Sequence, residues 1–184
     1  MRKSVRFSLL SAAAAVGITA SLYTRPILEY VLGKKHVYKQ AGEMAPKFSL
    51  ETTDGRCAEL RNGRTAIVSF WATWCAPCVA ELPEFEKLFL NNADADVILV
   101  NVTDGKNVTR EFLSAYGYTI PSAIDMPKKE CKSSALVCAE TFDAYGGNYS
   151  LPYTCAVTPC GRISRCFGPA DYEGLVRELK KAKK

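Results

Sequence analysis

The sequence predicts an α/β domain built on a mixed β-sheet with helices on both of its faces. Strand-like and helix-like segments alternate in the middle of the chain, which is typical of a parallel βαβ unit, and a β-hairpin followed by a helix ends it. Of the 184 residues, 48% are apolar and 23% are charged, as in soluble globular proteins. This composition excludes disordered, collagen-like and low-complexity chains.

Residues 1–33 are predicted to be an export signal or a membrane anchor. Arg2, Lys3 and Arg6 precede a mildly apolar, uncharged run from Phe7 to Tyr23, which is the usual order in exported proteins. The run is short for a membrane span, so cleavage and retention as an anchor are both open. Either alternative puts the folded part outside the cytoplasm.

Residues 34–45 are polar and are expected to be a linker, which leaves residues 46–184 as the domain. The net charge of +5 comes largely from the N-terminal segment, and the rest of the chain is nearly balanced. A nucleic-acid surface would need a basic stripe. We therefore expect no nucleic-acid partner.

The first elements of the domain are predicted to be a hairpin, a strand and a helix. Phe48 to Leu60 is interpreted as a β-hairpin with a turn at Thr53-Asp54-Gly55. Thr65 to Trp71 is β-branched and aromatic, as in a buried strand. Ala76 to Asn91 has apolar residues at helical spacing, and Pro83 should kink that helix.

The later elements follow from the same periodicities. Residues 126–137, which interrupt these later elements, are polar and are interpreted as an inserted loop that contains a cysteine. The expected elements are a strand at Val97–Val102, a helix at Asn107–Tyr116, a short extended segment at Ile120–Asp125, a short helix at Ala139–Tyr145, a hairpin of Tyr153–Val157 and Arg162–Phe167, and a closing helix at Asp171–Lys183.

Cys75 and Cys78 form a Cys-x-x-Cys motif where a strand gives way to a helix. At the helix N-terminus, free backbone N–H groups and the helix dipole stabilise a thiolate at Cys75. Cys78 follows one turn later, so Cys75 can attack a disulfide and Cys78 can resolve the mixed disulfide. Pro77 suits the first helical turn. The residues expected to wall the site are Phe70, Trp71 and Trp74.

Other interpretations of the motif are weaker. A zinc site needs a second pair of ligands, and the one histidine, His36, lies in the linker. A peroxidatic cysteine would follow a Pro-x-x-x-Thr-x-x-Cys pattern, in which this chain has Val68 and Ala72 instead. A structural disulfide is disfavoured because so tight a loop tends to be labile. We predict a redox pair with no metal and no diffusible cofactor, since the cysteines carry the electrons.

The segment from Phe70 to Pro83 resembles the active-site segment of TlpA/ResA-like (DsbE/CcmG-related) thiol–disulfide oxidoreductases. The resemblance covers about residues 42–182 and includes Ala45-Pro46 upstream and Leu151-Pro152 downstream. It implies a thioredoxin-like fold, here with an N-terminal β-hairpin and a Cys-containing insertion. It also implies an extracytoplasmic location, in the bacterial periplasm or at the outer face of the inner membrane.

The resemblance assigns roles to individual residues. Cys75 would be the nucleophile and Cys78 the resolving thiol. Pro152 would be a cis-proline that faces the disulfide, with Leu151 beside the bound substrate. A cis bond before proline is accessible energetically and exposes backbone for strand-like pairing with a substrate.

Three further residues near the motif are site candidates. Trp74 directly precedes Cys75, Pro77 directly precedes Cys78, and both are expected to contact the substrate. Glu81 falls where family members carry a glutamate, and it could adjust the acidity of the thiols or pass protons. The alternative for Glu81 is a solvated surface residue. Cytosolic thioredoxins have a buried acid six residues before the first cysteine, where this chain has Ser69.

The remaining cysteines are not part of the family motif, and six cysteines allow 15 pairings. Cys131 and Cys138 flank the insertion and could form a structural disulfide. In the later hairpin two cysteines could bridge each other, or one could reach the first hairpin. A second redox pair and a metal-binding loop are the alternatives. The residues concerned are Cys57, Cys131, Cys138, Cys155, Cys160 and Cys166.

The resemblance favours a reductase that acts on client proteins with cysteine pairs, in cytochrome c maturation or copper-site assembly. A membrane electron donor would reduce it again, and the N-terminal segment would hold it at the membrane. Ala76-Pro77 alone does not fix the direction, so an oxidase that forms disulfides is an alternative. A copper-binding chaperone with Cys75 and Cys78 as soft ligands is another.

Overall fold

The computed structural model describes residues 41–126, 139–147 and 150–183. These residues form a central sheet, a separate two-stranded hairpin and four helices. The elements in chain order are β1 (Ser49–Glu51), β2 (Cys57–Glu59), β3 (Thr65–Trp71), α2 (Ala76–Asn91), β4 (Ala95–Asn101), α3 (Lys106–Ala115), β5 (Ser122–Ile124), α4 (Glu140–Ala144), β6 (Tyr153–Val157), β7 (Ile163–Phe167) and α5 (Tyr172–Ala182).

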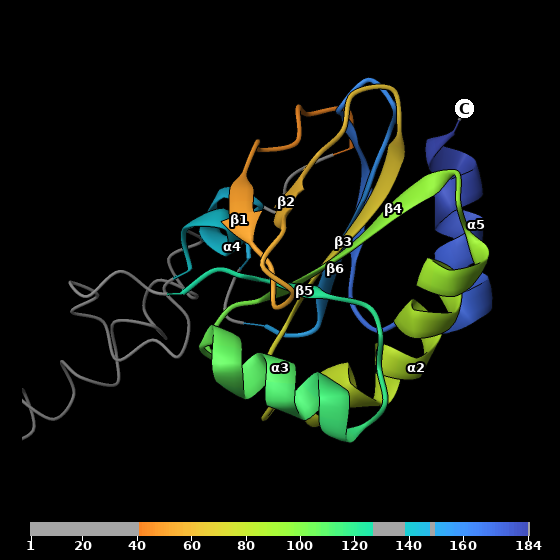
Figure 1. The fold of residues 1–184 in the computed structure, drawn as a ribbon. Coiled ribbons are helices and arrows are strands. Elements are labelled where there is room, and N and C mark those ends of the chain that lie inside the picture. The colour runs from red at the N-terminus through yellow and green to blue at the C-terminus, as the bar shows by residue number, and fades with distance from the viewer. Residues whose placement is uncertain (1–40, 127–138, 148–149, 184) are drawn as a thin grey trace, which may run out of the picture. The chain divides into compact units, whose positions relative to one another are not determined.

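The central sheet has the strand order β5-β4-β3-β6-β7 (Figure 1). β3, β4 and β5 run parallel, and β6 and β7 complete the sheet with antiparallel pairing. β3 is buried at every position, as its β-branched and aromatic sequence predicts. The register sets Trp71 opposite Asn101 of β4 and Phe70 opposite Tyr153 of β6. The end of β3 therefore lies between the end of β4 and the start of β6.

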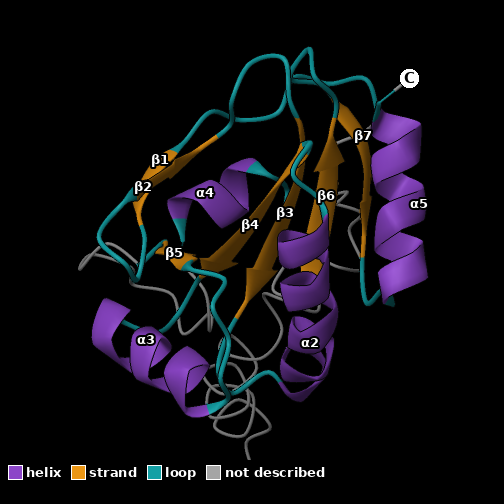
Figure 2. Ribbon diagram, turned by 45° about the vertical axis from the view of Figure 1, so that its right-hand side comes forward, coloured by secondary structure: helices purple, strands orange, loops and turns teal. Residues whose placement is uncertain are grey.

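The two faces of the sheet pack against different partners (Figure 2). Ile67 and Trp71 of β3 join the apolar side chains of α2 and α5 in one core cluster. Val68 and Phe70 point to the opposite face and pack with α4 and the β1–β2 hairpin in the other cluster. Alternate residues of a strand point to opposite faces, so a single strand fills both cores. Helices on both faces of a mixed sheet confirm the predicted fold class.

The β1–β2 hairpin docks on the edge strand β5. The backbone N–H of Thr53 donates to the carbonyl of Ser122 at 2.8 Å, and the N–H of Ser122 donates to the hydroxyl of Thr53 at 3.1 Å. Gly55 takes φ 83° in the predicted turn, a conformation that glycine adopts without steric cost. The hairpin covers an edge that would otherwise present unpaired backbone.

Every predicted element in the described residues appears, and some of them have shifted ends. The strand expected at Val97–Val102 starts at Ala95, because Ala95 already pairs with Thr65. α2 continues through Pro83 to Asn91 as one helix.

Several predictions fall on residues that the structure does not describe. The signal or anchor segment at 1–33, most of the linker and the proposed Cys131–Cys138 disulfide lie outside the described residues. Within the described part of the chain, none of the helices has the length and apolar character needed to cross a membrane.

Candidate functional site

Cys75 caps the N-terminus of α2 and is bonded to Cys78. Cys75 has an extended backbone, with φ −82° and ψ 95°, and its sulfur accepts a 3.3 Å hydrogen bond from the N–H of Cys78. The two sulfurs form a disulfide, and the Cα atoms are 5.2 Å apart. Cys75 is 4% exposed and Cys78 is 2% exposed. Pro77 stands exposed in the first turn between them. The strand-to-helix junction thus holds the pair as the sequence predicts.

The Leu151–Pro152 peptide bond is cis, as predicted. Phe70 pairs with Tyr153 across β3 and β6, so Pro152 stands beside the end of the strand that leads to Cys75. Leu151 is partly buried and packs on the core cluster that contains both cysteines. The structure therefore brings this peptide bond and the disulfide to the same edge of the sheet.

The aromatic residues around the motif do not all wall the site. Phe70 faces the opposite core, where its ring centroid lies 5.3 Å from the ring centroids of Phe142 and Tyr145. Its predicted place beside the cysteines is therefore wrong. The strand alternation is the reason, because Phe70 and Trp71 are neighbours in a β-strand. Trp71 shares a core cluster with both cysteines. Trp74 is 54% exposed, which leaves its ring available to a substrate.

Glu81 is buried rather than solvated. It is 7% exposed, one oxygen accepts from the N–H of Ala170, and the other buried oxygen has no hydrogen-bond partner. Burial raises the pKa of Glu81 to about 7. The residue lines an open groove of about 650 Å³ that reaches from Pro77 along α2, β7 and α5. Glu81 can therefore hold or release a proton near neutral pH beside the cysteine pair.

Comparison with known proteins agrees with this geometry. Residues 40–164 match the Redoxin family. The chain belongs to the Redoxin family. Within it, the chain is 31% identical to the thiol-disulfide oxidoreductase ResA of Halalkalibacterium halodurans over 144 residues, which cover 76% of this chain and 75% of ResA.

A second relative supports the same assignment, and a solved structure shows the same fold. The thioredoxin-like protein YneN of Bacillus subtilis is 39% identical over 109 residues, which cover 56% of this chain and 64% of YneN, less than two thirds of its length. The structure of a thiol:disulfide interchange protein of the thioredoxin family from Chlorobium tepidum has a TM-score of 0.61 at 24% identity. It covers 78% of this chain and 97% of that chain. This redoxin is a TlpA/ResA-like thiol–disulfide oxidoreductase with a thioredoxin-like fold.

The sequence reasoning missed the loop that follows β4 in this redoxin. Asp104 accepts a 2.9 Å hydrogen bond from the N–H of Thr73, and the hydroxyl of Thr103 accepts one from the indole of Trp74 at 3.0 Å. Asn101, which is fully buried, holds the loop through its side chain. The available signal was a polar Asn at the end of an otherwise apolar strand, next to the strand that carries the motif.

Glu178 on α5 is a second buried acid that the sequence reasoning missed. It is 4% exposed, lines the same groove as Glu81, and has one oxygen without a partner. Its other oxygen lies 2.8 Å from the ammonium of Lys181 and 3.7 Å from the guanidinium of Arg165. The signal was its position between Leu175 and Leu179, on the apolar face of the closing helix.

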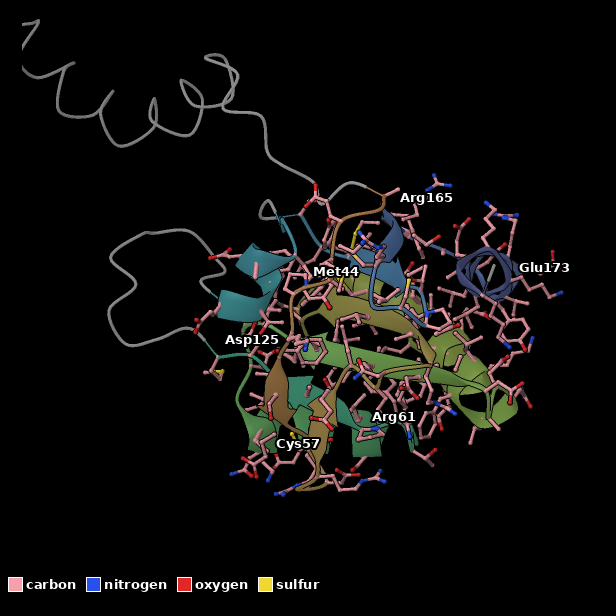
Figure 3. All side chains as sticks on the ribbon, turned by 90° about the horizontal axis from the view of Figure 1, so that it is seen from above. Met44, Cys57, Arg61, Asp125, Arg165 and Glu173 are labelled. Atoms are coloured by element: carbon pink, nitrogen blue, oxygen red, sulfur yellow. A yellow bond between two sulfur atoms is a disulfide. The ribbon has the colours of Figure 1, made fainter. Side chains whose placement is uncertain are left out.

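The other described cysteines of the redoxin divide into a bonded pair and two free thiols. Cys155 of β6 and Cys166 of β7 are directly opposite in the register and form a disulfide. Cys57 on β2 (Figure 3) and Cys160 in the β6–β7 turn are free and exposed. The hydroxyl of Thr158 lies 3.1 Å from the sulfur of Cys160, and this hydrogen bond lowers the pKa of that thiol. The Cys155–Cys166 disulfide is one of the pairings that the sequence left open.

Proposed function

We propose that this redoxin is an extracytoplasmic reductase that transfers electrons from the Cys75–Cys78 pair to disulfides of client proteins. The observation that carries the proposal is the disulfide at the N-terminus of α2, with the cis Leu151–Pro152 bond at the same sheet edge. The likeness to ResA supports it.

Reduction proceeds in two exchange steps. The Cys75 thiolate attacks one sulfur of the client disulfide, forms a mixed disulfide and releases the other client sulfur as a thiolate. Cys78 then loses its proton and attacks the Cys75 sulfur, which frees the second client thiolate and leaves the Cys75–Cys78 disulfide. Two electrons pass to the client, and its two thiolates take up two protons. A dithiol donor at the membrane must reduce the pair again before the next cycle.

Trp74, Pro77 and Leu151 provide the client-binding surface. The ring of Trp74 and the ring of Pro77 are exposed on either side of Cys75, and Leu151 precedes the cis bond. An extended client segment can pair with the backbone before Pro152 in the manner of an added strand.

Glu81 serves the second step as the proton acceptor of Cys78. It lies one helical turn from Cys78 on α2, and its pKa of about 7 lets it accept and return a proton without a large change in pH. The groove beside it gives that proton a route to solvent.

The N-terminal segment places the domain at the outer face of a membrane in this proposal. The basic residues before its apolar run and the likeness to ResA support this location. The clients would be proteins that need reduced cysteine pairs for haem attachment or copper-site assembly. The full chain should therefore sediment with lipid vesicles, whereas a chain beginning at Val37 should remain in the supernatant.

Turnover of a protein disulfide tests the proposal. Wild-type protein with dithiothreitol as donor should reduce insulin, and Cys75→Ser should abolish this activity. Cys78→Ser should instead accumulate a mixed disulfide between Cys75 and the client, visible by mass spectrometry. Loss of the mixed disulfide in Cys78→Ser, or full activity in Cys75→Ser, would overturn the assignment of the two cysteines.

A further inference from the structure

We propose that Asp104 is a positioning residue for disulfide exchange, which holds the Cys75 nucleophile in place through the backbone of Thr73. The inference rests on the proposed function, because it gives Asp104 a part in that reaction. Asp104 acts on the turn that precedes the cysteines, through the backbone N–H of Thr73.

The turn from Ala72 to Cys75 connects the end of β3 to the start of α2. Within the turn, the N–H of Cys75 donates to the carbonyl of Ala72 at 3.1 Å. The N–H of Thr73 is the donor that points away from the turn, and the Oδ2 of Asp104 accepts it at 2.9 Å. Two residues after this hydrogen bond, Cys75 begins the helix.

Asp104 is itself held by a rigid neighbour. The side-chain amide of Asn101 donates to the same Oδ2 at 3.0 Å, while its carbonyl oxygen accepts from the backbone N–H groups of Asp104 at 2.7 Å and of Thr103 at 3.1 Å. Asn101 is 0% exposed. It is also the direct partner of Trp71 in the β3–β4 register. The acceptor is therefore fixed to the sheet next to the strand that carries the motif.

The same loop holds the next residue as well. The indole N–H of Trp74 donates to the hydroxyl of Thr103 at 3.0 Å, so successive residues of the catalytic turn are bound to successive residues of the β4–α3 loop. Attack on a disulfide requires the incoming sulfur to align with the bond that breaks, and small displacements of a reacting group slow such reactions strongly. A turn tied at Thr73 and Trp74 limits the displacement of Cys75.

Three variants of the full chain test the inference. Asp104→Ala removes the acceptor, and Asp104→Asn keeps an oxygen acceptor of the same size without the charge. Asp96→Ala is the matched control, because Asp96 is a buried aspartate (6% exposed) on the adjoining strand β4. Asp96 pairs with Ala66 at the opposite end of the sheet from Asn101 and binds Arg61 and Arg64.

We expect Asp104→Ala to lower the second-order rate constant of the reduced protein about 10-fold or more. The loss should be the same with insulin and with the small disulfide dithionitrobenzoate, because the nucleophile itself is displaced. Asp104→Asn should recover most of the rate. Asp96→Ala should lower the unfolding temperature and leave the rate of the folded protein unchanged.

The outcomes separate this inference from the proposed function. If the wild-type protein fails to reduce either disulfide, the proposed function fails. If the wild type is active and Asp104→Ala reacts within about 2-fold of it, the positioning inference is wrong. A loss of rate with insulin alone would assign Asp104 to client binding instead. An equal loss of rate in Asp104→Asn would show that the charge and not the hydrogen bond matters. Either result would overturn the inference as stated.

Discussion

Glu81 shows at the residue scale how burial sets both stability and chemistry. A carboxyl group surrounded by protein loses the hydration that stabilises its charged form, so the pKa rises to about 7. The hydrogen bond from Ala170 lowers the pKa but does not compensate for the burial. The folded protein therefore keeps a proton on Glu81 at a pH where the unfolded chain has released it.

This difference predicts that stability falls as the pH rises. Below about pH 4.5 both states hold the proton, and above about pH 7 both have lost it, so the free energy of unfolding should decrease between these values. The contribution of this group is at most about 3 kcal/mol. Glu81→Gln should remove it, as measured by urea unfolding at pH 4.5 and pH 8. Glu84→Gln is the control; an unchanged pH dependence in Glu81→Gln would show that another group is responsible.

The proposed role of Glu81 in exchange gives a separate prediction. If Glu81 accepts the proton of Cys78, Glu81→Gln should slow the resolution of the mixed disulfide by about 10²-fold and leave its formation by Cys75 less affected. Quenched-flow measurement of the two steps with a labelled client distinguishes them. Equal slowing of both steps would indicate that Glu81 supports the fold of the site rather than proton transfer.

At the scale of elements, α5 begins at a side-chain cap. The carboxylate of Asp171 accepts from the N–H of Gly174 at 2.8 Å. A Cβ atom on Gly174 would lie 2.9 Å from this oxygen, so a side chain there would require the Asp171 carboxylate to shift. We expect Asp171→Ala to lower the free energy of unfolding by about 1 kcal/mol and Asp171→Asn to lower it less. Chemical denaturation of the three proteins checks this, and an equal loss in both variants would argue against capping.

The Cys155–Cys166 disulfide joins the edge strand β7 to β6. It closes a short loop, with a sequence separation of 11, and such a link typically contributes about 2–4 kcal/mol. The double variant Cys155→Ser/Cys166→Ser should therefore unfold at lower urea concentration while the folded protein keeps its exchange rate. A lost exchange rate at conserved stability would instead support a second redox pair.

The elements were predictable where one periodicity decided them. The β-branched and aromatic run of β3 and the helical spacing of α2 are local signals, and both elements appear where expected. The predicted side of the sheet is wrong for Phe70, because its nearness in sequence to Cys75 does not decide which face of the strand it occupies. Cys75 and Cys78 could be predicted from the motif, and the cis bond before Pro152 from the family resemblance of the Leu151-Pro152 segment.

Contacts between segments far apart in the chain could not be predicted from the sequence. Asp104 reaches Thr73 only because β3 and β4 are adjacent and parallel. Glu178 and Glu81 line the same groove because α5 packs beside α2. Such contacts depend on which strands and helices become neighbours in the fold, and no local sequence pattern predicts that.

For the whole molecule, the direction of electron flow is a property of the complete redox pair and its surroundings. The helix dipole and burial both change the acidity of the thiols, and with it the relative stability of dithiol and disulfide. The proposed reductase must have a reduction potential low enough for its dithiol to give up electrons to client disulfides.

The reduction potential of Cys75–Cys78 is the measurement that tests this account most directly. The full chain should be titrated against defined dithiothreitol or glutathione ratios, with Cys75→Ser as the control. We expect a value near or below about −220 mV, in the range of glutaredoxins and thioredoxin. A value near about −120 mV would contradict the reductase assignment and indicate an oxidase. A transition that persists unchanged in Cys75→Ser would place the active pair among the other cysteines.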